Sequence, residues 1–154
     1  MEIKPKTGIE SIYFGMSMDE ARKAWGDADE ISTFIPLEEN PQDRSVEWKY
    51  SNGIELSFDS DDGFLLGSIS CESKAATLNG LTVIGLTPNE LKLRFPEIKL
   101  DDEFELAIDE YKHSSLELSF WVRDGKVYSL TIYPEYDESG TEIIWPKEAT
   151  NEHG

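Results

Sequence analysis

Two stretches of this 154-residue chain decide how its fold is predicted: FGMSMDEARKAWG at residues 14–26 and IGLTPNELKLRFP at residues 84–96. At an offset of 70 residues they agree in kind at six positions. The matched pairs are Phe14 with Ile84, Gly15 with Gly85, Met16 with Leu86, Ser17 with Thr87, Glu20 with Glu90 and Trp25 with Phe95. Self-similarity of this kind is typical of a structural unit that is built twice.

Each stretch also carries the signal of a helix start. Residues 17–20 (SMDE) and 87–90 (TPNE) both have the capping-box pattern. In that pattern the first hydroxyl accepts a hydrogen bond from a backbone N–H inside the helix, and the glutamate reaches back to the cap. We therefore predict two short helices, which end at Gly26 and before Pro96, because glycine caps a helix readily and proline cannot continue one.

A second similarity follows at an offset of 62 residues, where IELSF at 54–58 matches LELSF at 116–120. Apolar and polar residues alternate in both, which indicates half-buried strands. An Asp-Gly pair follows each one, at 62–63 and at 124–125. Asp-Gly between two apolar runs is a strong hairpin signal, so a meander of antiparallel strands is predicted after each helix.

These patterns predict an α+β fold made of two tandem units over residues 8–71 and 77–134. Each unit has a short strand, a capped helix and a three-stranded antiparallel meander, with both helices packed on one face of the sheet. A single copy of about 60 residues buries little apolar surface by itself, which explains why two would be joined.

The predicted division of the chain is a first repeat unit at 1–74, a second at 75–136 and a C-terminal extension at 137–154, in one compact body. Trp145 in the extension either follows an added edge strand or docks in a partner. The polar end of the extension, residues 147–154, is predicted to be disordered.

The charge of the chain is strongly negative: 32 acidic residues against 14 basic residues give a net charge of −18. Such a surface repels nucleic acid and anionic membranes, and it attracts basic proteins. Solubility or a salt-adapted proteome would explain the same acidity. With 38% apolar and 11% aromatic residues, the acidity is expected to lie on a folded globule.

The sequence contains no glycine-rich phosphate loop, no nucleophile elbow and no spacing of metal ligands. We therefore predict no catalytic residues, no cofactor and no metal. Cys71 is the single cysteine and is expected to be a buried thiol. Residues 1–15 lack the apolar run of a signal peptide, so a cytoplasmic protein is predicted.

The long segment 31–47 holds eight more residues than its counterpart in the second copy and is rich in carboxylates. Long loops in compact domains are often functional. Five residues are predicted to contact a partner: Glu38, Glu39, Asp43, Trp48 and Trp121. The carboxylates would steer a basic protein, and the two tryptophans would anchor it, unless they form a packed second layer. Further aromatic candidates on the strands are Tyr50, Tyr111, Tyr128 and Tyr133.

The motif Gly15-x-Ser17-x-x-Glu20, running to Trp25-Gly26-Asp27 and followed by a meander, resembles the tandem units of the beta-lactamase inhibitor proteins. It is similar also to the small lipoproteins of outer-membrane barrel assembly and to the acidic immunity proteins of bacterial polymorphic toxins. These resemblances imply protein binding without catalysis, often through a concave antiparallel sheet. The missing export signal and the missing cysteine pair in each unit favour the immunity proteins.

The leading functional hypothesis is therefore an acidic immunity or antitoxin-like protein that neutralises a cationic toxin or effector by direct binding. The alternative is an adaptor or assembly protein whose partner is not a toxin, and a small enzyme is the third possibility. Nucleic acid and membranes are not expected as partners.

Overall fold

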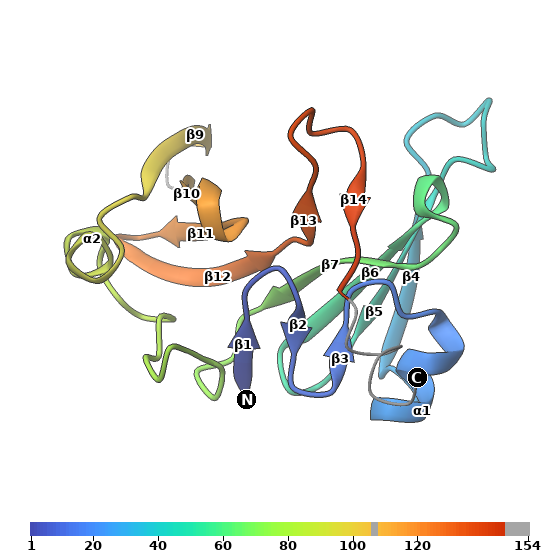
Figure 1. The fold of residues 1–154 in the computed structure, drawn as a ribbon, viewed down its shortest axis with the longest axis horizontal. Coiled ribbons are helices and arrows are strands. Elements are labelled where there is room, and N and C mark those ends of the chain that lie inside the picture. Colours follow the sequence, from blue (N-terminus) through green and yellow to red (C-terminus); the bar gives the residue numbers. More distant parts are fainter. Residues whose placement is uncertain (106–107, 147–154) are drawn as a thin grey trace.

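The computed structural model describes residues 1–105 and 108–146, and in these residues the chain is mostly β-structure (Figure 1). The strands are β1 (Glu2–Lys4), β2 (Gly8–Ile9), β3 (Ile12–Tyr13), β4 (Glu30–Phe34), β5 (Ser45–Lys49), β6 (Ile54–Asp59), β7 (Leu66–Cys71), β8 (Thr77–Leu78), β9 (Lys99–Glu105), β10 (Ile108–His113), β11 (Leu118–Arg123), β12 (Lys126–Ile132), β13 (Glu135–Tyr136) and β14 (Ile143–Ile144). The helices are α1 (Met18–Trp25) and α2 (Pro88–Arg94), with single 3-10 turns η1 (Ser60–Asp62) and η2 (Ser114–Leu116).

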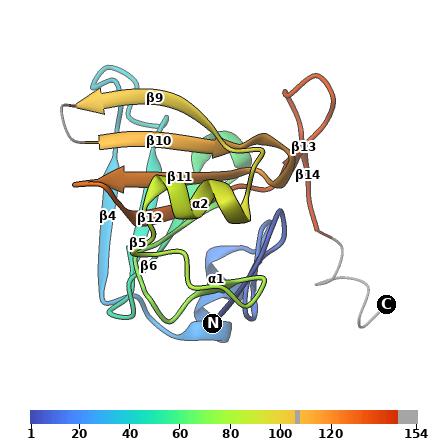
Figure 2. The ribbon, with the colours of Figure 1, turned by 90° about the vertical axis from the view of Figure 1, so that its left-hand side faces the viewer.

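An eight-stranded antiparallel sheet dominates the fold, in the order β4-β5-β6-β7-β12-β11-β10-β9. Its two four-stranded halves meet where β7 pairs with β12, with Ile69 opposite Ile132. Figure 2 shows β4 running across the direction of β9, β10 and β11, so the sheet is strongly twisted from one edge to the other.

The apolar core lies on one face of this sheet. Along β6, Ile54, Leu56 and Phe58 are at most 1% exposed, while Glu55 and Ser57 between them face the other way. A second sheet of order β3-β2-β1-β8 covers the core face, and Figure 1 shows β1, β2 and β3 in front of the large sheet. Alternating side chains therefore send one set of residues into the core and leave a polar set on the opposite face.

Both predicted helix starts are confirmed. Ser17 Oγ accepts from the Glu20 backbone N–H at 3.1 Å, and Glu20 Oε1 accepts from the Ser17 N–H at 3.0 Å. Thr87 and Glu90 make the same pair of bonds, at 3.2 and 3.0 Å. The capping box is local chemistry, which explains why the sequence alone located it.

The predicted α+β fold, with tandem units and helices packed on the sheet, is wrong. The helices have only eight and seven residues, and the one fully buried residue in each is Ala21 in α1 and Leu91 in α2. The four-stranded sheet covers much of the core instead, and its strands have only two or three residues. Such short strands leave no alternating pattern in the sequence, so the capped helices dominated the prediction.

The small sheet also joins the two segments that the prediction separated. β1 pairs in parallel with β8, with Ile3 opposite Leu78. The N-terminal strand therefore depends on residues from the second predicted unit, and the chain is not a simple tandem repeat. Residues 147–154, which were predicted to be disordered, lie outside the described residues.

The hairpin β13–β14 ends with Trp145, which packs on the body of the protein. A Cβ atom placed on Gly15 would lie 3.1 Å from the Trp145 ring, so the indole lies directly on this glycine. Gly15 has φ +92°, a conformation that favours glycine independently of the contact. Trp145 therefore contacts its own chain in this structure.

Neither of the described helices is long and apolar enough to cross a membrane.

Candidate functional site

The face of the eight-stranded sheet opposite the core, which we call the open face, is lined by small hydroxyl side chains. Glu55 on β6 pairs with Ser70 on β7, which pairs with Thr131 on β12, which pairs with Ser119 on β11. Trp121 lies on the same face as Ser119, two residues along β11. The row lies outside the apolar core cluster, although Ser119 and Thr131 are only 0% and 8% exposed.

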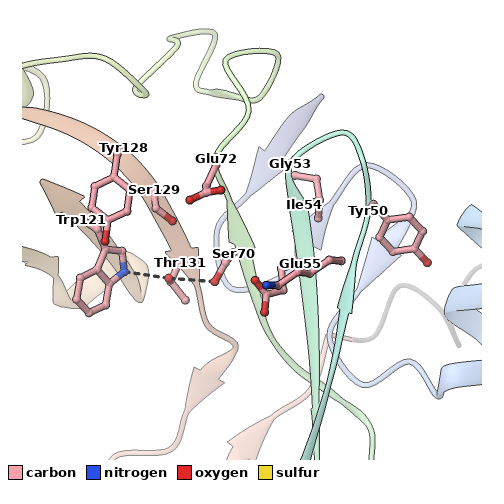
Figure 3. Close-up of a pocket in the computed structure, with 11 residues that line it drawn as sticks. Tyr50, Gly53, Ile54, Glu55, Ser70, Glu72, Trp121, Tyr128, Ser129 and Thr131 are labelled. Carbon is pink, nitrogen blue, oxygen red and sulfur yellow. Dashed lines mark hydrogen bonds between the residues drawn. The ribbon is translucent and has the colours of Figure 1, made fainter. Parts of the chain in front are cut away.

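A groove of about 490 Å³ crosses the open face, and we call it the central groove. Residues that line it include Lys49, Glu55, Glu72, Trp121, Tyr128 and Thr131. Figure 3 shows Trp121 and Tyr128 on one side of the groove and the carboxylates of Glu72 and Glu55 toward the other side, where Tyr50 also lies. The groove therefore places an aromatic wall opposite an acidic one.

A hydrogen bond and a cation–π contact orient the two rings of the aromatic wall, Trp121 and Tyr128. Trp121 Nε1 donates to Thr131 Oγ1 at 3.0 Å, and Thr131 Oγ1 lies 3.3 Å from Ser70 Oγ (Figure 3). Next to it, the Arg123 guanidinium lies 4.2 Å from the centre of the Tyr128 ring. These contacts limit the rotamers of both rings, which lowers the entropy that a bound partner would have to remove.

The acidic wall carries a carboxyl group with a perturbed pKa. Burial is the main cause that raises the pKa of Glu55, and the nearby charges of Glu47, Glu72 and Glu30 raise it further. The ammonium group of Lys49 lowers this pKa and opposes them. Three neighbouring carboxylates thus outnumber the one ammonium group around Glu55, so a cation that entered the groove would be attracted to this wall.

We expect Glu55→Gln to make the protein more stable at neutral pH. The raised pKa means that the charged form is disfavoured in the folded state, so folding is opposed above the raised pKa. The extra stability of the variant should shrink as the pH falls through the pKa that Glu55 has in the folded protein. It should vanish below the pKa that Glu55 has in the unfolded chain, because residue 55 is then neutral in both parent and variant. Urea unfolding at a series of pH values measures this. Glu38→Gln, in the exposed loop, is the control. If the extra stability of Glu55→Gln grew on acidification, the raised pKa of Glu55 would be contradicted.

A further carboxylate lies beyond Trp121 on the open face. Glu110 is opposite Trp121 across the β10–β11 pair and is only 6% exposed. Ser119 Oγ donates to Glu110 Oε2 at 2.5 Å. The pKa of Tyr133 is raised, first by burial, while a hydrogen bond with Ser119 lowers it. This cluster extends the polar floor toward β10.

Trp48 was predicted to anchor a partner unless it was packed, and the structure shows that it is packed. Trp48 is 2% exposed on the core face, where its ring lies 4.9 Å from that of Phe58, and the Arg22 guanidinium covers it at 5.2 Å. Trp121 lies on the opposite face of the sheet. Strand alternation assigns each tryptophan to one of the two faces of its strand. It does not tell which of the two faces packs on the core.

The acidic loop and Trp121 do not converge. The loop between β4 and β5 carries the exposed side chains of Glu38, Glu39 and Asp43. This loop enters β5 at Ser45. The groove borders the other end of β5, at Lys49, and a rise of about 3.3 Å per residue puts roughly 13 Å of strand between the two ends. Binding by the three loop carboxylates stays a prediction for a separate surface.

Sequence reasoning did not single out Glu55, Glu72, Ser70 or Thr131. The alternating polar positions of β6 and β7 were the available signal, since they mark the solvent side of a strand. The pairing of β7 with β12 joins residues about 60 positions apart, and no local pattern predicts it. Tyr50 and Tyr128, which also line the groove, were among the aromatic candidates.

Within residues 1–105 and 108–146, no group of three or more histidine, cysteine, aspartate or glutamate side chains is arranged to hold a metal ion. The lining of the central groove has hydroxyls, carboxylates and aromatic rings, which suit hydrogen bonding and cation binding.

Comparison with known proteins gives a likeness of fold alone. No protein-family model matches the chain, and no curated protein matches it. The structure is similar to the crystal structure of the uncharacterized protein yfeY from Escherichia coli, with a TM-score of 0.54 and 13% sequence identity. The match covers 86% of this chain and 99% of that one, so the shared fold extends over nearly the whole of the yfeY structure.

Proposed function

We propose that this protein binds a basic protein partner in the central groove, and that its specific role is to neutralise a cationic toxin or effector in the cytoplasm. One observation carries the proposal: Trp121 and Tyr128 face Glu55 and Glu72 across a groove on the open face. Aromatic rings beside carboxylates are the surroundings that a lysine or arginine side chain prefers.

The chemistry of the groove explains how such a partner would be held. A guanidinium or ammonium group would stack on an aromatic ring and donate to a carboxylate, and both contacts strengthen where water is excluded. Ser70 and Thr131 on the floor can donate or accept further hydrogen bonds. The net charge of −18 would raise the association rate of a basic protein.

One consideration supports the specific role. A small acidic protein with a preformed groove needs no chemistry of its own to block a basic active site, because binding alone excludes the substrate.

Affinity capture from the cells that make this protein tests the proposal. The parent protein and a Trp121→Ala/Glu72→Lys variant are immobilised, and the retained proteins are compared by mass spectrometry. Glu138→Lys, which changes an exposed charge that does not line the groove, is the matched control. We expect one basic protein to be retained by the parent and the control but not by the groove variant.

Purified partner then gives the kinetics. Glu72→Lys should slow association, more strongly at low than at high salt, because screening weakens steering between charges. Trp121→Ala should speed dissociation by about tenfold or more, as expected for an interfacial tryptophan. A partner that is acidic, or one that binds the groove variant as it binds the parent, would refute the proposal. A basic partner that is not a toxin would leave the groove assignment standing and overturn the immunity role.

A further inference from the structure

The strand β4 is an exposed edge of the large sheet. All five of its residues are exposed, and among the described residues it pairs only with β5. Apolar side chains gather on the strand and the loop that follows it: Ile31, Phe34, Ile35 and Leu37 are 57%, 61%, 40% and 55% exposed. An edge of this kind presents unpaired backbone groups beside apolar surface, which is what another strand requires.

The opposite edge of the same sheet differs. The pairing of β9 with β10 contains two register shifts, next to Ile108 and next to Glu110. Irregularities of this kind twist an edge and discourage pairing with another chain. The pairing of β4 with β5 is regular through all five residue pairs. The sheet therefore has one irregular edge and one regular edge that can accept a strand.

Charge decides which strand would fit. Glu30 begins β4, and Glu38 and Glu39 follow in the loop, where all three are exposed. A second copy of this chain would bring another net charge of −18 to the same edge. Like charges at close range oppose that pairing, whereas a basic segment would gain from it.

We propose that β4 binds an extended, basic segment of a partner protein, which adds to the large sheet as a further strand. Backbone hydrogen bonds to β4 would supply affinity independent of sequence. Alternate side chains of the segment would contact Ile31 on one face and Phe34 on the other, and its lysines or arginines would reach Glu30 or Glu38. The inference shares with the proposed function only the class of partner, and it does not require the central groove.

A blocked ten-residue peptide of alternating valine and lysine is the probe, and its valine–glutamate counterpart is the charge control. Calorimetric titration gives the affinity, and amide hydrogen exchange locates the peptide. We expect the basic peptide to bind and to slow the exchange of amides in residues 30–34. Phe34→Ser should weaken binding about tenfold, as loss of an apolar anchor does, and Leu93→Ser should not. Leu93 is the matched control, since it is 83% exposed on α2 and away from this edge.

Several results would overturn the inference. Among them are equal binding of the acidic peptide, equal weakening by Leu93→Ser, and binding without slower exchange in β4. Light scattering that shows a dimer disrupted by Phe34→Ser would identify a second copy as the occupant instead. Trp121→Ala separates the two sites: it should remove only binding at the groove, and it should leave the slower exchange in residues 30–34, and the loss of that slowing in Phe34→Ser, unchanged. If it abolishes binding, the peptide occupies the groove, and the β4 inference fails while the proposed function stands.

Discussion

Replacing Trp48 by alanine should lower the free energy of unfolding by about 3–5 kcal/mol, the range for truncating a large buried aromatic residue. Trp48 is 2% exposed, packs against Phe58 and is covered by Arg22, so its removal leaves a cavity that the rigid β5–β6 pair cannot close. Urea unfolding, followed by circular dichroism, measures the change. A loss of this size is a large fraction of the total free energy of unfolding of an ordinary domain.

Trp121→Ala is the matched control for this experiment. Trp121 is half-buried on the open face, so the variant should lose much less stability, on the order of the 1 kcal/mol of its hydrogen bond to Thr131 plus a smaller packing loss. Equal losses for the two variants, or a stable Trp48→Ala protein, would contradict the assignment of these residues to opposite faces.

Gly8→Ala should be about as damaging as the loss of Trp48. A Cβ atom at Gly8 would lie 1.9 Å from the Ile12 carbonyl oxygen, and the obstructing atom belongs to the backbone of β3. Gly8 pairs with Tyr13 in the small sheet, so the β2–β3 hairpin would have to open. We expect a loss of roughly 3 kcal/mol or more, typical of a clash that a fixed backbone cannot relieve. Thermal unfolding measures it.

Gly80→Ala separates that clash from simple backbone strain. Gly80 has φ +76°, and a Cβ atom there would meet nothing within 4 Å. Its replacement should therefore cost only about 1–2 kcal/mol, the penalty of a left-handed conformation for alanine. If both glycine variants lose the same stability, the close approach of β2 to β3 is not as described.

The parts of the fold that depend on neighbouring residues could be predicted from the sequence. The capping boxes at Ser17 and Thr87 are of this kind, and so is the strand alternation of residues 54–58. The covering layer could not be predicted, because Gly8–Ile9 and Ile12–Tyr13 are too short to show a period. Similar helices in two places suggested a repeat of helices on a sheet, while most of the core contacts come from strands.

The candidate site shows the same limit. The alternation of Glu55 with its apolar neighbours predicted that one face of this strand would be polar. The pairing of β7 with β12 brings Glu55 on β6 and Trp121 on β11 to the same groove, and this pairing exists only in the folded chain. The loop carboxylates were conspicuous in the sequence because they cluster along it, but the fold places them at the far end of β5 from the groove.

The most direct test of the central claim is a titration of the ¹⁵N-labelled protein with N-acetyl-arginine amide, following the indole N–H signals of its four tryptophans. Trp121→Phe and Trp48→Phe assign the two signals that matter. We expect a saturable shift of the Trp121 signal, none of the Trp48 signal, no response to N-acetyl-glutamate amide, and a weakened response in a Glu55→Gln/Glu72→Gln variant. A Trp121 signal that does not move with the arginine derivative, or that moves equally with the glutamate derivative, would contradict a groove built to hold cations.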